Sequence, residues 1–283
     1  MSIPPERLPE PLESTPPSTS FVPGEVLEPP LQVVPVPARK SFPAWSAWDL
    51  LALILFSGVV LTVFLLASYF VARTLPQFRH ASFTDIAMDA RVVIAAQAAA
   101  YGVILLFVLF TVRSRSHESF REGIRWNWPG VTAPAFIAAG VVLALVVDSL
   151  ARFLPIPKSL PIDTYFHDAT SAYIMAIFGI TLAPLLEEIF FRGLLFPLLE
   201  KYFAVVGGVL LTAAAFAAIH GAQLGYAWAP VLSIFVVGVV FTVVRLKRNS
   251  VAASFLMHCG YNLALFSALW IGSGHFHHLD KVT

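Results

Sequence analysis

Long stretches without charged residues alternate with short polar segments along most of this chain. Residues 50–72, 92–112 and 126–147 contain no Asp, Glu, Lys or Arg, and a fourth apolar run begins at residue 169. A helix needs about 20 apolar residues to cross a hydrocarbon core that is about 30 Å thick. Each of the first three stretches is therefore long enough to form a transmembrane helix.

The interval 202–244 is also free of Asp, Glu, Lys and Arg, and it is too long for a single crossing. The segment HGAQLGY at 220–226 contains two glycines, which commonly interrupt helices, and it divides the interval. A last apolar run extends from about residue 250 to residue 271. The pattern predicts an all-α fold, a polytopic transmembrane helix bundle of about seven spans, or eight if one of the longer stretches is broken.

The composition agrees with a protein that lies in a bilayer. The 283 residues are 58% hydrophobic and 12% charged, and the mean hydropathy is +0.78. Soluble domains carry about 25% charged residues, roughly twice as many. We therefore expect a multi-pass integral membrane protein in contact with membrane lipid, in the plasma (inner) membrane of a bacterium or the ER membrane of a eukaryote. The sequence contains no basic tract and no nucleic-acid motif, so no nucleic-acid partner is expected.

The first 43 residues differ from the rest in composition, because they hold 12 of the 21 prolines and five glutamates. Such a segment buries too little apolar surface to offset the entropy lost on ordering, so residues 1–43 are predicted to form a disordered tail. The first apolar run is long enough to span the membrane, which argues against a cleaved signal peptide. Lys and Arg near the ends of the predicted spans number ten on the side of the N-terminus and six on the other, which favours a cytoplasmic N-terminus.

Three charges occur inside an apolar run at 185–196, LLEEIFFRGLLF. An ionisable residue at bilayer depth costs about 3 kcal/mol on insertion scales, so it normally faces the bundle interior and has a partner. Glu188 and Arg192 are four residues apart, on one helix face where they can pair. Glu187 is rotated by about 100° from Glu188, so its partner must come from another helix. A structural role between helices would explain the pair, whereas the additional carboxylate favours chemistry.

Two prolines flank these charges, Pro184 before the glutamates and Pro197 after Arg192. Because proline lacks an N–H and its ring clashes with the preceding turn, the helix is predicted to kink on both sides. Such kinks open space for substrate and water.

Two later apolar runs hold polar residues that could meet these charges. FAAIH at 216–220 ends with His220, and HCGYN at 258–262 places His258 and Asn262 one turn apart on one face. With a rise of about 1.5 Å per residue, these groups and the charges of the preceding helix fall in a layer about two turns thick. They are therefore expected to line one cavity, although a single intramembrane histidine more often forms only a hydrogen bond between helices.

This set of side chains suits hydrolysis of a peptide bond. The reaction needs a base for the attacking water, donors for the developing oxyanion and a proton for the leaving amine. The candidate catalytic residues are Glu187, His220, His258 and Asn262, and the supporting residues are Glu188 and Arg192. The first two would activate a water, the next two would bind the oxyanion, and the ion pair would hold Glu187 in place.

The segments EEIFFR, FAAIH and HCGYN match in order the motifs EExxxR, FxxxH and HxxxN. In these motifs the chain resembles the CPBP (CAAX protease and bacteriocin-processing, Abi) family of integral membrane proteins, which includes the CAAX prenyl endoproteases. The resemblance implies an all-helical intramembrane protease in which the six residues have the roles given above. It suggests a protease core over 130–272. Two N-terminal transmembrane helices with a basic interfacial loop, predicted over 44–129, fall outside the resemblance, and a C-terminal tail is predicted over 273–283.

The resemblance leaves the cofactor open, because the family has been described as metal-dependent and as glutamate-dependent. Glu187, His220 and His258 could supply three ligands to Zn²⁺ or another divalent metal. The sequence contains no HExxH helix, and a water activated by glutamate and histidine needs no ion. A metal-free mechanism is therefore favoured, with the metal-dependent peptidase as the alternative.

The substrate also stays open at this point. A CAAX endoprotease cuts a prenylated C-terminal peptide, so the expected substrate is a peptide or a lipidated protein. Other relatives are linked to bacteriocin immunity or to scaffolding in the membrane, and a transporter is a further non-enzymatic alternative. A transporter would more often show internal repeats, which this sequence lacks.

Overall fold

The computed structural model describes residues 42–116 and 118–279. Within these ranges every regular element is a helix and no strand is present, as the apolar pattern predicts. The predicted tail of residues 1–43 lies outside the described residues except for its last two, and residues 280–283 lie outside them as well. The described helices belong to one compact unit, Lys40–Thr283.

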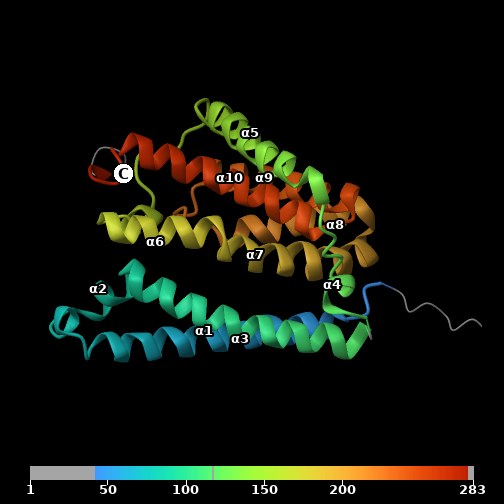
Figure 1. Cartoon of the computed structure of the whole chain (residues 1–283), viewed down its shortest axis with the longest axis horizontal. Coiled ribbons are helices and arrows are strands. Elements are labelled where there is room, and N and C mark those ends of the chain that lie inside the picture. The colour runs from blue at the N-terminus through green and yellow to red at the C-terminus, as the bar shows by residue number, and fades with distance from the viewer. Residues whose placement is uncertain (1–41, 117, 280–283) are drawn as a thin grey trace, which may run out of the picture. The chain divides into compact units, whose positions relative to one another are not determined.

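Two long antiparallel helices begin the described chain and lie side by side (Figure 1). They are α1 (Ala47–Ala72) and α3 (Ala90–Ser116), with η1 (Pro76–Phe78) and α2 (Phe83–Ala87) between them and α4 (Phe120–Gly123) after them. Phe56 and Phe107 stack between the two long helices with ring centroids 4.4 Å apart. Both helices are uncharged over most of their length, as the first two apolar runs predict.

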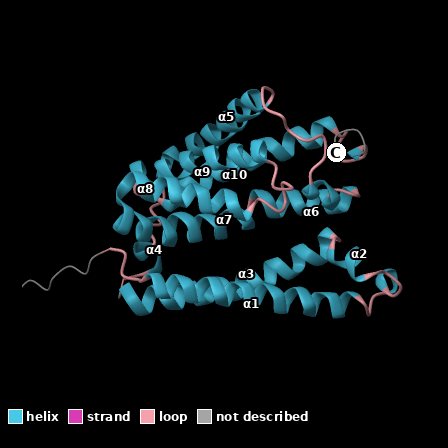
Figure 2. Cartoon of the chain, turned by 180° about the vertical axis from the view of Figure 1, so that it is seen from behind, coloured by secondary structure: helices cyan, strands magenta, loops and turns pink. Residues whose placement is uncertain are grey.

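The remaining helices pack around α10. They are η2 (Gly130–Thr132), α5 (Ala133–Ala151), η3 (Pro161–Tyr165), α6 (Ala169–Ile180), α7 (Leu182–Glu188), the π-helical segment η4 (Ile189–Leu195), α8 (Phe196–Ile219), α9 (Trp228–Arg248) and α10 (Val251–Gly272). Helix α10 contacts α5, α6, α7 and α9, and Figures 1 and 2 show it among them from opposite sides. The HCGYN motif therefore lies on a helix that contacts these four.

Six stretches of the described residues are long and apolar enough to cross a membrane. The longest, Ala169–Ile219, has 51 residues, and as one straight helix it would extend about 76 Å. It does not run straight, because Phe203 and Ala204 leave the helical conformation and a Cβ on Gly208 would lie 2.8 Å from the main-chain nitrogen of Glu200. In a straight helix Gly208 and Glu200 would be about 12 Å apart along the axis. The chain therefore folds back here, and this stretch provides two of about seven crossings.

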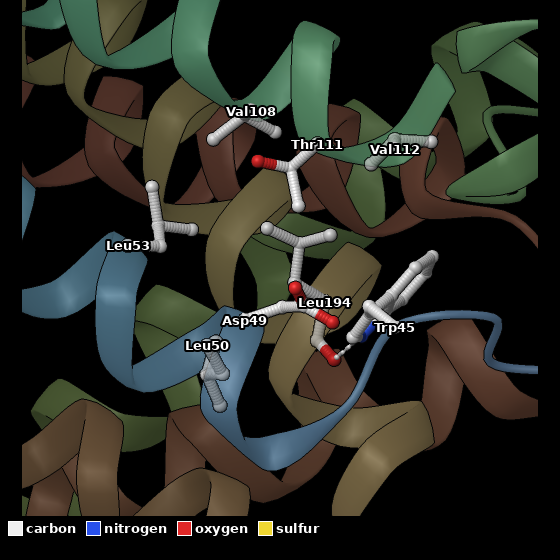
Figure 3. Close-up of a pocket in the computed structure, with 8 residues that line it drawn as sticks. All are labelled: Trp45, Asp49, Leu50, Leu53, Val108, Thr111, Val112 and Leu194. Atoms are coloured by element: carbon white, nitrogen blue, oxygen red, sulfur yellow. Dashed lines mark hydrogen bonds between the residues drawn. The ribbon is translucent and has the colours of Figure 1, made fainter. Parts of the chain in front are cut away.

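A small hollow lies where the first helix pair meets the π-helical segment (Figure 3). Its lining residues are Trp45, Asp49, Leu50, Leu53, Val108, Thr111, Val112 and Leu194. Its volume of about 10 Å³ is close to the minimum that one water requires. Trp45 Nε1 donates to the main-chain carbonyl of Leu194 at 3.0 Å. None of the candidate catalytic residues lines the hollow, and the bond between Trp45 and Leu194 attaches the start of α1 to the helix that carries them.

Helices α5 and α10 cross at main-chain distance through two glycines. A Cβ on Gly140 would lie 2.0 Å from the carbonyl oxygen of Met257, and a Cβ on Gly260 would lie 2.1 Å from that of Ile137. Small residues let membrane helices approach closely, and van der Waals packing then holds them together. The crossing keeps α10, and with it His258, at a defined depth beside α5.

We expect Gly260→Ala to destabilise the protein by about 1–3 kcal/mol, because the added methyl group forces two backbones apart. The measurement is the midpoint of thermal unfolding in detergent. Gly102→Ala in α3 is the matched control, since a Cβ there meets no atom within 4 Å. An equal effect of the two substitutions would contradict the close crossing.

Candidate active site

The helix that carries the charged residues is irregular on both sides of the two glutamates. Thr181 separates α6 from α7 with φ −118° and ψ −73°, three residues before Pro184. The π-helical segment η4 follows Glu188 directly and ends two residues before Pro197. Proline cannot donate a main-chain hydrogen bond, so regular α-helix is disfavoured at both places. Short π-helical segments occur frequently at functional sites.

Glu188 is completely buried, and its carboxylate has three side-chain partners. Oε1 accepts from Arg192 Nη1 at 2.9 Å and lies 3.0 Å from His258 Nδ1, and the hydroxyl of Ser254 donates to Oε2. Because an ionised carboxylate only accepts, His258 must carry a proton on Nδ1. A buried carboxylate is stable when its charge is paired and its remaining lone pairs are satisfied. Glu188 thus joins α7 to α10.

Arg192 is the second completely buried charge, and it extends the network to α9. Its Nη2 donates to the main-chain carbonyl of Gly238 at 3.0 Å. The guanidinium carbon lies 4.5 Å from the ring centroid of Phe216 and 5.4 Å from that of Phe241. Nε is buried without a hydrogen-bond partner among the described residues. The aromatic faces around the guanidinium partly offset this loss through cation–π attraction.

Glu187 has a different environment from its neighbour Glu188. Its side chain is 17% exposed, and Oε2 lies 3.7 Å from His258 Nε2, which is longer than a hydrogen bond. His258 therefore lies between the two carboxylates, with Nδ1 towards Glu188 and Nε2 towards Glu187. Of the two, Glu187 is the carboxylate that a water could reach.

His220 lies at the end of α8, and it reaches the cluster through an aromatic ring. Its ring centroid is 4.7 Å from that of Phe216, which in turn packs edge-on against His258 at 5.8 Å. His220 Nδ1 is 2.8 Å from the main-chain carbonyl of Phe216. A carbonyl only accepts, so Nδ1 carries a proton, and a neutral ring in this orientation has its lone pair on Nε2. Within the described residues His220 forms no hydrogen bond or ion pair with either glutamate.

Asn262 lies one turn beyond His258 on α10, and it contacts α6 rather than the charged residues. Its Nδ2 donates to the main-chain carbonyl of Gly179 at 2.6 Å. This bond uses one of the two N–H groups of the amide, so the second remains for another acceptor. Asn262 therefore both ties α10 to α6 and keeps one donor.

Two members of the network are not among the residues that the sequence singled out, Ser254 and the carbonyl of Gly238. A signal for Ser254 exists, because Ser254, His258 and Asn262 follow at intervals of four and share one face of a helix. The Gly238 carbonyl has no such signal, since any residue carries one. Only the packing of α9 against η4 selects it.

The three residues that could form a metal site are not assembled as ligands in this structure. Among the described residues, no three His, Cys, Asp or Glu side chains lie close enough together to hold a metal ion. His258 Nδ1 faces Glu188, and His220 Nδ1 faces the carbonyl of Phe216. Both bonds leave Nε2 of each histidine as the nitrogen that could bind an ion, but Glu187, His220 and His258 are not close enough together here to form a three-ligand site.

These observations define the class, a multi-pass integral membrane protein with a buried glutamate–arginine–histidine cluster between its helices. Residues 169–264, about a third of the chain, match the family described as Type II CAAX prenyl endopeptidase Rce1-like. The matched segment runs from α6 into α10 and contains all six candidate residues. No curated protein and no solved structure matches the chain. The match confirms the resemblance to the CPBP family, and it supports a CAAX-type intramembrane peptidase at the level of the family.

We expect Arg192→Met to destabilise the protein by about 3–5 kcal/mol, because it leaves the carboxylate of Glu188 buried without its counter-charge. The measurement is again the midpoint of thermal unfolding in detergent. Arg152→Met is the matched control, since Arg152 pairs with Asp148 at the same spacing and a similar distance, 3.0 Å, but the two side chains are 76% and 60% exposed. Exposed pairs contribute little, so this control should unfold like the wild type. A small effect of Arg192→Met would contradict the role of the buried pair.

Proposed function

We propose that this protein is an intramembrane endopeptidase that hydrolyses a peptide bond near or within the membrane, with Glu187 and His220 activating the attacking water. The observation that carries the proposal is the contrast between the two adjacent glutamates. Glu188 has three side-chain partners and no exposure, whereas Glu187 is partly exposed and, among the described residues, makes one ion-pair contact, at 3.7 Å from His258. A purely structural cluster needs one such pair and has no use for a second carboxylate at bilayer depth.

In the proposed reaction a water proton passes to Glu187 or to Nε2 of His220. The hydrogen bond from Nδ1 to the carbonyl of Phe216 supports the second route, because it leaves Nε2 as the acceptor. The water oxygen attacks the carbonyl carbon of the substrate to form a tetrahedral intermediate. The C–N bond then breaks, and the proton is returned to the leaving amine. One water would have to bridge Nε2 of His220 and the carboxylate of Glu187.

The oxyanion would be held by Asn262 and His258. Asn262 retains one amide N–H after its bond to Gly179. His258 donates a hydrogen bond from Nδ1 to Glu188, so it would donate from Nε2 only when both ring nitrogens carry protons. Two donors directed at one oxyanion are a common arrangement in acyl transfer.

The proposed substrate is a lipid-bearing peptide, and the matched family supports a peptide or prenylated protein at the level of the class. Residues 130–272 would be the protease core, and α1 and α3 would support it through the contact between Trp45 and Leu194. The site would be reached from the bilayer of the plasma (inner) membrane or the ER. The mechanism would be metal-free, because a water activated by a glutamate and a histidine needs no ion.

We expect Glu187→Gln to lower kcat for a lipidated peptide by about 10²–10⁴-fold, because the amide keeps the shape but removes one of the two groups that would activate the water. The assay is cleavage of a quenched-fluorescent lipidated peptide library by purified protein. Glu118→Gln is the control, since it removes the same charge from an exposed position between α3 and α4. A Glu187→Gln protein that cleaves at the wild-type rate would contradict the proposal.

The same assay with a strong chelator tests the cofactor. We expect wild-type activity to persist after metal removal, because a glutamate and a histidine can activate water without an ion. Loss of activity that added Zn²⁺ restores would establish the metal-dependent peptidase instead. If the wild type cleaves nothing in the library and Glu187→Gln retains the cellular role of the protein, a non-enzymatic role such as immunity, scaffolding or transport is correct.

A further inference from the structure

The main-chain carbonyl of Arg192 has no donor from its own helix. In an α-helix the N–H of Phe196 would serve it, but that N–H bonds to the carbonyl of Phe191 in the π register. In the π register the donor would be residue 197, which is a proline and has no N–H. Arg192 is completely buried, so water does not replace the missing donor. A buried carbonyl in this position requires a donor from elsewhere in the fold.

Arg245 supplies that donor from the last turn of α9. Its Nε donates to the carbonyl oxygen of Arg192 at 3.1 Å. Arg245 is only 4% exposed, its Nη1 donates to Asn249 Oδ1 at 3.2 Å, and its guanidinium carbon lies 5.6 Å from the ring centroid of Phe196. A charged donor forms a stronger hydrogen bond than a neutral one. Lys247 and Arg248, in the same turn, are exposed, so Arg245 does not belong with them as a basic residue at the membrane surface.

Helix α9 therefore contacts Arg192 at two points. The Gly238 carbonyl accepts from the guanidinium of Arg192, and Arg245 donates to the main chain of Arg192. Gly238 and Arg245 are seven residues apart, about two turns, so they lie on the same face of α9. One contact holds the charged end of Arg192 and the other holds its backbone. Together they set the position from which Arg192 reaches Glu188.

We infer that Arg245 is a positioning residue of the candidate active site, and this inference rests on the proposed function. Arg245 holds the π-helical segment in place through the carbonyl that Pro197 leaves without a donor. Through Arg192 it fixes the position of Glu188, and through Glu188 the position of His258 relative to Glu187. Arg245 itself is not expected to touch the substrate.

The test is a double-substitution cycle between Arg245 and Pro197. We expect Arg245→Met to lower kcat for a cleavable lipidated peptide by about tenfold or more and to change KM by less than about twofold, because the peptide still binds but the catalytic groups are displaced. Lys247→Met is the control, since it removes a charge from the exposed side of the same turn, and it should leave both parameters unchanged.

Pro197→Ala provides the rescue. It adds a main-chain N–H at the position that faces the Arg192 carbonyl in the π register, so Arg245→Met combined with Pro197→Ala should recover most of the lost kcat. Arg245→Lys should fall between wild type and Arg245→Met, because a lysine can donate but lacks the planar fork. Wild-type kcat in Arg245→Met, or a loss that Pro197→Ala does not change, would overturn the inference.

Hydrogen–deuterium exchange over residues 189–196 gives a readout that does not depend on activity. Arg245→Met should accelerate exchange in this segment, Lys247→Met should not, and Pro197→Ala should restore protection in the double variant. Failure of the proposed function would appear as a wild type without peptidase activity in which this exchange pattern still holds. Failure of the inference would appear as an active wild type in which exchange over 189–196 is the same in Arg245→Met.

Discussion

The ion pair between Glu188 and Arg192 is the interaction on which the arrangement of the other helices depends. Two charges removed from water and lipid are stable only when their remaining donors and acceptors are also satisfied. The partners come from α10, through His258 and Ser254, and from α9, through the carbonyl of Gly238. Burial of the pair therefore requires three helices to assemble at one relative depth and rotation. The close crossing of α5 and α10 at two glycines supports the same register from the other side.

Adjacent carboxylates acquire different properties because a helix turns by about 100° per residue. Glu188 points into the helix interface and is surrounded by donors, whereas Glu187 points towards a partly exposed position. His258 lies between them and contacts both through different nitrogens. Its ring is thereby oriented by the structural carboxylate while its other nitrogen faces the exposed one. In the proposed reaction Glu188 would be the supporting group and Glu187 the reacting group.

The π-helical segment connects the stability of the fold to the proposed chemistry. Pro197 removes a main-chain donor in the segment that carries Arg192, and Arg245 replaces it from another helix. A purely α-helical segment would satisfy its own carbonyls and would not need α9 in this way. The irregular backbone thus makes the position of the ion pair dependent on tertiary contacts. The contact between Trp45 and Leu194 extends this dependence to α1.

The sequence by itself determined the all-helical class and the approximate places of the apolar helices, because the bilayer thickness sets the length of an uncharged run. Their ends differ from the uncharged runs, as in α5, which begins at Ala133 rather than near residue 126. The sequence also determined the pairing of Glu188 with Arg192, which follows from their spacing of four. The same spacing places Ser254 on the helix face of His258, although the sequence analysis did not select it. Only the tertiary structure decided which glutamate is enclosed, that His220 bonds to Phe216 rather than to a carboxylate, and that Asn262 bonds to Gly179. The tertiary structure also buries Arg245 in the protein interior, although a basic residue near a helix end is typically found at the membrane surface. These outcomes depend on the rotation and depth of helices that are distant in the chain, and local spacing contains no information about either.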